Sequence, residues 1–473
     1  MRIPPCIAAI TGALLLSTGA GVTAVGTGVG VAGSATPAAI SPFAVLLHPG
    51  ERYAGPSSAT PPTLAHCEAA LHVACYGPGQ IQQAYNLPAL FSTGVTGTGE
   101  TIIIVDSFGS PTIGHDLSVF DKTYGLPAPP TFDVIQAAGP VPAYVPDNAR
   151  VGWAGETNLD VEYAHAMAPG AAILLVETPT SENEGTTGFP QIVQAEEYVI
   201  DHHLGDVISQ SFSATEETFP SAQSLIALRA PYIDAHQHDV TVLAASGDSG
   251  AADVRANGTY YPFPVTSWPD SDPLVTGVGG TQLKLDSNGN HTGPDVVWND
   301  TDDVPTNKFI FGNAGPNPLA GGGGQSIIFS RPSYQDAVKS VVGSQRGVPD
   351  ISMSAACNGA VNAYQSFAGQ PAGWYPVCGT SEATPLFSGI VALADQMAGR
   401  PLGLINPALY SLSSSGAPGI VDVTQGNNSV SFTQGHVLKS VTGFPALPGY
   451  DLASGVGTID AGTFVPELAQ AAG

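Results

Sequence analysis

Residues 155–176 read GETNLDVEYAHAMAPGAAILLV, and this segment predicts a helix followed by a strand. The helix is expected from about Gly155 to Ala168, because Pro169-Gly170 cannot continue it. The apolar run Ala172–Val176 has the length of a strand. The alternation extends in both directions, with strands expected at 101–105, 207–211 and 240–245 and helices at 192–203 and 222–236. This order predicts an α/β fold with a central parallel β-sheet flanked by helices on both faces. Catalytic groups should then gather at the carboxyl ends of the strands.

Positive charge is scarce along the whole chain. Its 473 residues include 13 Lys and Arg against 39 Asp and Glu, which gives a net charge of −26. Charged residues make up 11% of the chain, against about 25% in ordinary globular proteins. No basic run is present to bind nucleic acid, and the shortage also argues against docking on anionic lipid. In acid most carboxylates become neutral, so few like charges remain to repel one another. The composition therefore indicates tolerance of acid.

The N-terminal part of the sequence differs in composition from the rest. Arg2 is followed by the apolar run Ile7–Leu16 and then by small residues, which is the pattern of a secretory signal peptide. We therefore expect a secreted, extracellular protein. The expected division is a signal peptide with a small-residue leader at 1–38, a mobile leader or short prosegment at 39–66, and one folded domain at 67–473.

Four cysteines remain after the predicted signal, namely Cys67, Cys75, Cys357 and Cys378. An even number in an exported chain suggests disulfides. Three pairings are possible. We favour Cys67–Cys75 together with Cys357–Cys378, because the partners are then close in sequence.

Ser381 belongs to the segment CGTSEATP, residues 378–385, which precedes an apolar run expected as a helix at Leu386–Ala398. Pro385 is compatible with the first turn of that helix. Ser381 is therefore expected at a helix N-terminus, where the helix dipole would stabilise an oxygen that becomes negative. Two interpretations fit this position: a nucleophile, or a serine that only caps the helix.

Three carboxyl residues are candidates to work with such a serine. Glu156 and Asp160 are four residues apart in the expected helix, so they share one face, where repulsion separates their pKa values. The alternative for this pair is a solvated acidic face. Asp248 follows the strand at 240–245 in the segment ASGDSG, so it is expected at the carboxyl edge of the sheet. That segment also fits a Gly-rich turn, or a lipase-type motif with Ser249 as nucleophile. The late Asp-x-x-His of such a lipase is missing near the C-terminus.

A second pair of carboxylates lies near the C-terminus, in Val421-Asp422-Val423 and in Gly449-Tyr450-Asp451. With carbonyls from the adjoining turns they form the kind of oxygen set that Ca²⁺ prefers. Ordinary turn chemistry uses the same residues.

Together these motifs are specific. The segments GETNLDVEYAHAMAPGA, AASGDSGA, YPFPVTSWPDSDPLVTGVGGT, GGGGQSIIFSRPSYQ, GVPDIS and CGTSEATPLFSG follow one another between residues 155 and 389. From about Cys67 to Gly457 the chain resembles the sedolisin family, the serine-carboxyl peptidases. The resemblance implies a subtilisin-like α/β fold and an acid-acting enzyme that hydrolyses peptide bonds through an acyl-enzyme.

The resemblance also assigns roles to the candidate residues. It implies Ser381 as nucleophile, Glu156 as general base and Asp160 as the group that orients Glu156. Asp248 becomes the oxyanion-hole donor, beside the Ser381 N–H. A carboxylate can act as a base in acid, where histidine is protonated. A carboxyl group can donate to an oxyanion only while it holds its proton, which acid and burial both favour.

One structural calcium ion is implied in the same way. Its ligands would be the carboxylates of Asp422 and Asp451 and the carbonyls of Val423, Leu447 and Gly449. Leu447 stands where the family usually has Gly. Family members usually carry a long prodomain, whereas about 66 residues precede the peptidase pattern here. The expected partners are protein or peptide substrates, with no nucleic acid and no membrane after signal removal, and the expected state is a monomer.

Two other functions remain open on the sequence alone. One is a subtilisin-type Ser-His-Asp protease that uses Asp106 and His165. Against it, His165 is nine residues from Glu156 and therefore lies on the opposite face of the expected helix. The other is a non-catalytic, calcium-stabilised exported binding protein. The motifs do not decide between an endopeptidase and a tripeptidyl-peptidase.

Overall fold

The computed structural model describes residues 60–182 and 185–472. The predicted signal peptide and leader at 1–38 lie outside the described residues, as does most of the segment 39–66. The predicted domain boundary at Cys67 falls inside helix α1, Leu64–Ala70, whose first turn is capped by the Thr63 side chain. Regular structure is therefore already present before the predicted boundary.

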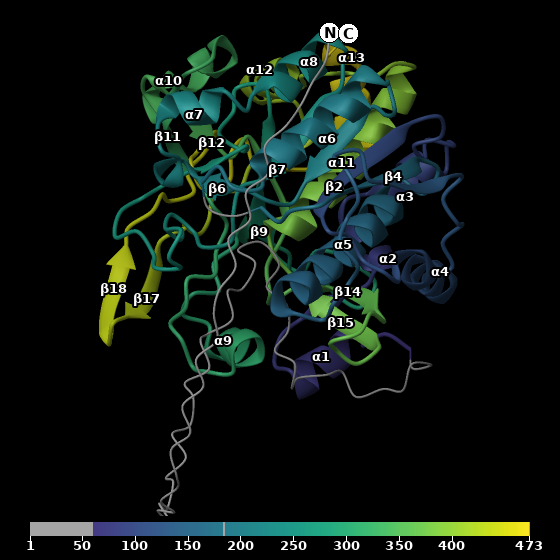
Figure 1. The fold of residues 1–473 in the computed structure, drawn as a ribbon, viewed down its shortest axis with the longest axis horizontal. Coiled ribbons are helices and arrows are strands. Elements are labelled where there is room, and N and C mark those ends of the chain that lie inside the picture. Colours follow the sequence, from purple (N-terminus) through teal and green to yellow (C-terminus); the bar gives the residue numbers. More distant parts are fainter. Residues whose placement is uncertain (1–59, 183–184, 473) are drawn as a thin grey trace, which may run out of the picture. The chain divides into compact units, whose positions relative to one another are not determined.

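A central sheet of eight strands organises the described residues (Figure 1). Its path is β10–β9–β7–β5–β2–β4–β3, and β13 pairs with β9 off this path. Seven strands run parallel and β10 alone is antiparallel to its neighbour. The bounds are β2 Thr101–Ser107, β3 Phe132–Ile135, β4 Ala172–Thr178, β5 Val207–Gln210, β7 Thr241–Ala245, β9 Thr276–Gln282, β10 Val296–Val297 and β13 Ile351–Ser354. The predicted α/β fold with a parallel sheet is confirmed.

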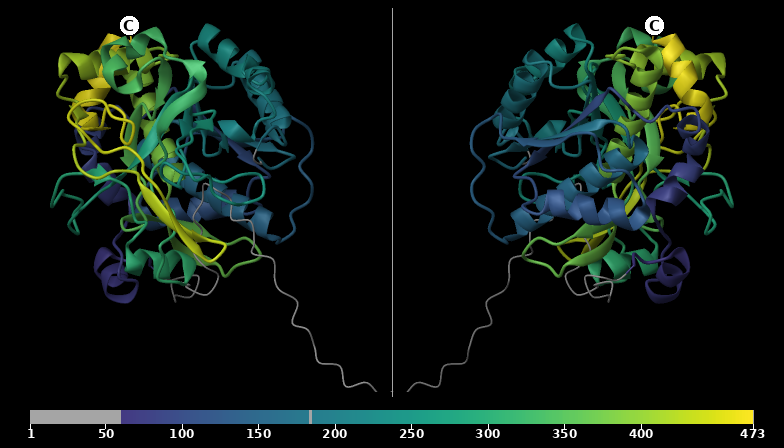
Figure 2. Two further views of the ribbon diagram at one scale, coloured as in Figure 1. Left: turned by 90° about the vertical axis from the view of Figure 1, so that its left-hand side faces the viewer. Right: turned by 90° about the vertical axis from the view of Figure 1, so that its right-hand side faces the viewer.

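Strand β2 illustrates how the sheet is buried on both faces. Ile102 and Ile104 belong to one apolar core, whereas the alternate residues Ile103 and Val105 belong to a second. Helices α5 and α11 pack on the first face, and α6 and α8 pack on the second. Their bounds are α5 Asn148–Met167, α6 Phe189–Asp201, α8 Ala230–Gln237 and α11 Thr380–Ala398. In Figure 2 the teal helices around residues 190–240 lie on the opposite side from the green and yellow C-terminal helices.

The helix predicted at 222–236 is two helices, α7 Ala222–Ile226 and α8 Ala230–Gln237. Pro231 has no N–H to continue the first helix, but it is accommodated in the first turn of the second. The helix predicted from Gly155 begins earlier, at Asn148, because the Asp147 carboxylate accepts a hydrogen bond from the Arg150 N–H, 2.9 Å, and caps it.

Helix α11 also begins earlier than predicted, at Thr380. Gly379 precedes it with φ 130°, a conformation that glycine adopts without strain. Pro385 consequently lies in the second turn, where it cannot donate a hydrogen bond to the carbonyl of Ser381 four residues earlier. The Ser211 hydroxyl, directly after β5, lies 3.5 Å from that carbonyl oxygen. The start of α11 is therefore held partly by a neighbouring strand end.

Smaller sheets surround this centre. They are β1 Cys75–Tyr76 with β14 Ala360–Gln365 and β15 Gly373–Val377, β6 Ala214–Thr215 with β8 Ser267–Trp268, β11 Gly324–Ser330 with β12 Gln345–Val348, β16 Ile420–Val421 with β19 Thr458–Ile459, and β17 Val430–Gln434 with β18 Val437–Val441. The remaining α-helices of the described ranges are α2 Pro78–Ala84, α3 Leu87–Phe91, α4 Ile113–Tyr124, α9 Val304–Phe311, α10 Lys339–Val342, α12 Asn406–Ser415 and α13 Ala461–Ala471.

Two disulfides join the cysteines as predicted, Cys67 with Cys75 and Cys357 with Cys378. Among residues 60–182 and 185–472, no helix combines the length and apolar character that crossing a bilayer requires.

Candidate active site

The structure brings the four predicted catalytic residues together at the carboxyl edge of the central sheet. Glu156 and Asp160 lie on α5, Asp248 follows β7, and Ser381 is the second residue of α11. All four side chains are buried, with 3% exposure or less. Helices α5 and α11 pack extensively against each other, so the carboxylates of one helix face the first turn of the other.

Glu156 is next to Ser381. Burial raises the pKa of Glu156 well above its usual range, and a hydrogen bond from the Ser381 side chain opposes this increase. It is a weak bond, because neither Glu156 oxygen has a partner of standard hydrogen-bond geometry. Asp160 is positioned more firmly, since its Oδ1 accepts a hydrogen bond of 2.9 Å from the Ser211 hydroxyl. Ser211 therefore contacts both Asp160 and the Ser381 carbonyl, and it links the carboxylate helix to the serine helix.

A third carboxyl group, that of Asp106, lies next to the Glu156 and Asp160 pair. Asp106, in β2, is fully buried and interacts with Asp160. Burial raises the pKa of Asp106 to about 7, and repulsion from Glu177 adds to the increase, while a hydrogen bond from Thr157 opposes it. Sequence reasoning had placed Asp106 only in the alternative Ser-His-Asp protease. Its position at the end of the first apolar strand is the signal that could have added it to the carboxyl cluster.

Asp248 lies on the other side of the α11 N-terminus. Its Oδ1 accepts hydrogen bonds from the Thr380 N–H, 2.7 Å, and from the Thr380 hydroxyl, 2.9 Å. The Thr380 hydroxyl oxygen in turn accepts from the Gly247 N–H, 3.1 Å. Oδ2 of Asp248 is buried and has no hydrogen-bond partner among the described residues. One oxygen is thus fixed by the turn before Ser381, and the other is available to carry a proton.

The electrostatics of the cluster favour proton binding. Burial raises the pKa values of Glu156 and Asp160 well above the ordinary range, and repulsion from Asp106 acts on both in the same direction. Burial likewise raises the pKa of Asp248, against the lowering effect of the Thr380 hydrogen bonds. Such closely spaced carboxyl groups titrate as one unit. The arrangement is therefore suited to holding protons on some carboxyl groups while another is ionised.

His165 is engaged elsewhere. On α5 it is fully buried, its Nε2 is 2.8 Å from the Pro127 carbonyl oxygen, and the same nitrogen is 3.4 Å from Oδ1 of Asp121. Burial lowers the pKa of His165. These contacts give the alternative Ser-His-Asp protease no support, because the side chain that contacts Ser381 from α5 is Glu156.

The predicted calcium ligands lie around one loop. The Gly449 N–H donates to Oδ2 of Asp422, 2.9 Å, and the Leu447 N–H donates to Oδ2 of Asp451, 2.8 Å. Asp451 Oδ1 is fixed by the N–H groups of residues 453 and 454. Two carboxylates thus converge on the stretch that supplies the predicted carbonyls, a donor set that fits Ca²⁺. No cluster of three or more His, Cys, Asp or Glu side chains suited to a metal occurs in the described ranges.

A polar cavity of about 480 Å³ lies apart from these residues. None of Glu156, Asp160, Asp248 and Ser381 contributes to it. The residues that line it are Gln282, Val296, Val297, Asn299, Asp302, Asp303, Gln425, Gly426, Asn427 and Ser429. We assign no role to this cavity.

The subtilase family model matches residues 150–408, more than half of the chain and the whole span of the four residues above. The chain belongs to the subtilase family. Within this family it is similar to the sedolisins. Kumamolisin from Bacillus sp. (strain MN-32) is 30% identical over 403 residues, which cover 81% of this chain and 62% of kumamolisin. Sedolisin from Pseudomonas sp. (strain 101) is 30% identical over 373 residues, which cover 78% of this chain and 58% of sedolisin.

Two further comparisons also show similarity of this subtilase to sedolisin-type proteins. Human tripeptidyl-peptidase 1 is 30% identical over 319 residues, which cover 64% of this chain and 50% of that protein. The solved structure of Pseudomonas sedolisin, a serine-carboxyl proteinase complexed with two molecules of pseudo-iodotyrostatin, superposes with a TM-score of 0.68 at 27% identity. The match covers 83% of this chain and 98% of that one. The chain spans between half and two thirds of the length of the three curated relatives.

Proposed function

We propose that this subtilase is a secreted serine-carboxyl peptidase that works in acid and cleaves peptide bonds through an acyl-enzyme on Ser381. One observation supports the proposal: in the first turn of α11 the Ser381 side chain interacts with the Glu156 carboxyl group, and the neighbouring Thr380 is bound by the Asp248 carboxyl group. A serine that only capped the helix would need neither buried carboxyl group.

In the proposed reaction, Oγ of Ser381 bonds to the carbonyl carbon of the substrate while its proton moves to Glu156. Asp160 orients Glu156 and is itself held by Ser211. The tetrahedral intermediate collapses as its C–N bond breaks, and the amine leaves with the proton from Glu156. Water then attacks the acyl carbon and gives a proton to Glu156. The ester bond to Oγ of Ser381 breaks, Glu156 passes that proton to Oγ, and the carboxylic acid product leaves.

Asp248 serves in this scheme as the oxyanion donor. Its Oδ1 is occupied by Thr380, so the proton would reside on Oδ2 and point to the negative oxygen of the intermediate. The Ser381 N–H is the second donor, at the positive end of the α11 dipole. Burial of Asp248 supports this role, because it raises the pKa of the carboxyl group and keeps the proton in place.

The pH dependence follows from the number of protons held. Activity needs an ionised Glu156 and a protonated Asp248. On the acid side, activity appears as the Glu156–Asp160–Asp106 cluster loses its first proton. On the alkaline side, activity disappears as Asp248 or the cluster loses a further proton. A bell-shaped profile of kcat/KM is expected, with an optimum in acid.

Calcium and location belong to the same proposal. Asp422, Asp451 and the carbonyls of Val423, Leu447 and Gly449 would hold one structural calcium ion, which would bring positive charge to a loop where two carboxylates converge. The signal-like N-terminus supports secretion. The proposed partners are protein or peptide substrates, and the proposed state is a monomer.

The test is mass spectrometry of the products from N-blocked and free peptides between about pH 3 and pH 7. Cleavage in acid is expected, with Ser381→Ala inactive and Glu156→Gln reduced by about 10³-fold or more. Glu162→Gln is the matched control. Glu162 is equally buried on α5, but it accepts a hydrogen bond from the Tyr364 N–H, 3.0 Å, outside the site.

Each alternative has its own result in this experiment. A neutral optimum that His165→Ala removes while Glu156→Gln stays active would establish the Ser-His-Asp protease. No cleavage at any pH by a folded, calcium-loaded protein would establish the binding module. The products from blocked and free peptides separate an endopeptidase from a tripeptidyl-peptidase.

A further inference from the structure

The turn before Ser381 is covalently tied to a second turn. Cys378, three residues before Ser381, forms a disulfide with Cys357, and the Cα atoms are 4.9 Å apart. Both cysteines are buried. The Gly379 N–H also donates to the Ala355 carbonyl, 2.8 Å. The chain entering α11 is therefore bound to residues 355–357 by one covalent bond and one hydrogen bond.

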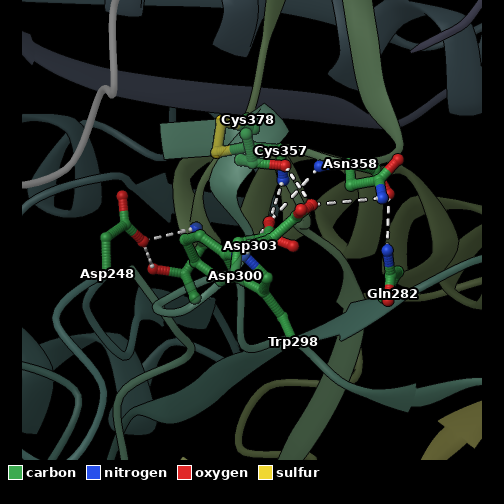
Figure 3. Close-up of a disulfide and its surroundings, with 10 residues drawn as sticks. Asp248, Gln282, Trp298, Asp300, Asp303, Cys357, Asn358 and Cys378 are labelled. Carbon is green, nitrogen blue, oxygen red and sulfur yellow. Dashed lines mark hydrogen bonds between the residues drawn. A yellow bond between two sulfur atoms is a disulfide. The ribbon is translucent and has the colours of Figure 1, made fainter. Parts of the chain in front are cut away.

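The second turn is anchored by Asp300. Oδ2 of this buried carboxyl group accepts hydrogen bonds from the N–H of Cys357, 2.9 Å, and from the N–H of Asn358, 3.3 Å. The indole N–H of Trp298 donates to the same oxygen, 2.8 Å. Figure 3 shows Trp298, Asp300 and the disulfide grouped together, with Asp248 to one side. One carboxyl oxygen thus fixes the backbone of the turn that carries Cys357.

Asp300 is also connected to Asp248, so the contacts form a closed ring. The Ala320 N–H donates to the Asp248 carbonyl, 3.0 Å, and the Asp300 N–H donates to the Leu319 carbonyl, 2.8 Å. The side chain of Asp248 then accepts from Thr380, two residues after Cys378. Starting from Asp248, the ring runs through the segment 319–320, Asp300, the disulfide and Thr380, and it returns to Asp248. The start of α11 is held from both sides.

The other disulfide differs in this respect. Cys67 and Cys75 join α1 to β1, eight residues apart in sequence. The Cys75 sulfur lies beside the carbonyls of Pro62 and Thr63. This pair reaches the turn of Cys357 only indirectly, through Ala74, which is hydrogen-bonded to Asn358 and Gly359, and among the described residues it makes no hydrogen bond to residues 378–380. The chain therefore contains its own control for the effect of losing a disulfide.

We propose that the Cys357–Cys378 disulfide and Asp300 are positioning residues for the peptidase reaction, holding the turn 378–380 so that Ser381 and Asp248 keep their mutual geometry. The inference rests on the proposed function. These groups do not touch substrate, and they act through the backbone of Gly379 and Thr380. Because they set the geometry of the reacting groups, their loss should reduce kcat and leave KM nearly unchanged.

The experiment compares two double variants with the wild type, Cys357→Ala/Cys378→Ala and Cys67→Ala/Cys75→Ala. Peptide cleavage at the acid optimum gives kcat and KM, with kcat taken per folded molecule, and thermal unfolding gives the stability of each protein. The first variant is expected to lose about 10- to 100-fold in kcat, with KM within about twofold of the wild type. The second variant should keep the wild-type kcat, even if its thermal stability falls as much as that of the first variant.

A second pair of variants tests the anchor without removing a disulfide. Asp300→Asn presents either an amide donor or a weaker acceptor to the three N–H groups, so it should lower kcat in the same way. Asp303→Asn is the control. The Asp303 carboxylate accepts a hydrogen bond from the Thr306 hydroxyl, and its contact with the Asn358 side chain is long, at 3.5 Å.

The outcomes separate the two proposals. If the wild type cleaves no peptide, the proposed function is wrong. If the wild type is active and both Cys357→Ala/Cys378→Ala and Asp300→Asn retain its kcat per folded molecule, the positioning role alone is wrong. Equal losses of kcat in the two disulfide variants would also overturn it, because the loss would then come from lower stability and not from the position of the disulfide next to Ser381.

Discussion

Asp395 gives a direct measure of how strongly this fold depends on acid. The residue lies near the end of α11 and is fully buried, and its Oδ1 accepts a hydrogen bond from the Leu402 N–H, 3.0 Å. Burial raises the pKa of Asp395 from 3.8 to about 8, and repulsion from Glu100 adds to the increase. The folded chain therefore binds this proton more tightly than the unfolded chain does.

The sign and size of the effect follow from that difference. Because the folded pKa is above the unfolded one, the stabilisation is complete below about pH 4 and is lost as the pH rises towards 8. Each pKa unit corresponds to about 1.4 kcal/mol, so this group alone costs on the order of 4 kcal/mol of unfolding free energy between pH 4 and pH 7. An asparagine stays neutral and can still accept from Leu402. Asp395→Asn should therefore match the wild type at pH 4 and exceed its stability at pH 7.

Urea unfolding at pH 4 and at pH 7 measures both free energies. Asp336→Asn is the matched surface control, because the Asp336 side chain is 62% exposed and pairs only with Arg331, a contact worth about 1 kcal/mol or less. The reasoning fails if Asp395→Asn changes the unfolding free energy equally at the two pH values, or if the wild type is as stable at pH 7 as at pH 4.

Three further predictions concern the site and the loop. Asp248→Ala should lower kcat by about 10²- to 10³-fold. Asp248→Asn, whose amide donates at every pH, should move the alkaline limb of the profile upward, and an unchanged limb would remove Asp248 from that role. Ser211→Ala should lower kcat by about tenfold, since Asp160 loses its hydrogen bond; kinetics at the acid optimum check this, and an unchanged kcat contradicts it. Calcium removal by a chelator should lower Tm in the wild type and have much less effect in Asp422→Asn. Equal shifts in both proteins would argue against this loop as the calcium site.

The sequence predicted the sheet and the four site residues for clear physical reasons. Apolar runs such as Ile102–Val105 are buried on both faces, and that requirement produces an unmistakable strand pattern. Glu156 and Asp160 were paired by helical periodicity, and Asp248 was placed by the strand before it. The assignment of chemical roles came from the resemblance to sedolisins and not from these patterns.

Other features were not predictable from local sequence. The start of α11 at Thr380 depends on Asp248, which accepts hydrogen bonds from the Thr380 backbone and side chain across the sheet edge. Ser211 gave no signal, because a serine after a strand is common and its partners come from two different helices. The break between α7 and α8 has a local signal in Pro231, which the prediction of a single helix at 222–236 leaves out.

The proposed active site is distributed over distant parts of the chain. Its carboxyl cluster needs β2 and α5, its oxyanion donor needs the loop after β7, and its serine needs α11, so residues from Asp106 to Ser381 must all be in place. The first turn of α11 cannot be completed by its own hydrogen bonds, because Pro385 leaves the Ser381 carbonyl to Ser211. A partly folded chain thus carries the nucleophile without the groups that activate it. Under the proposed function, a molecule can cleave peptides only after all of these parts have come together.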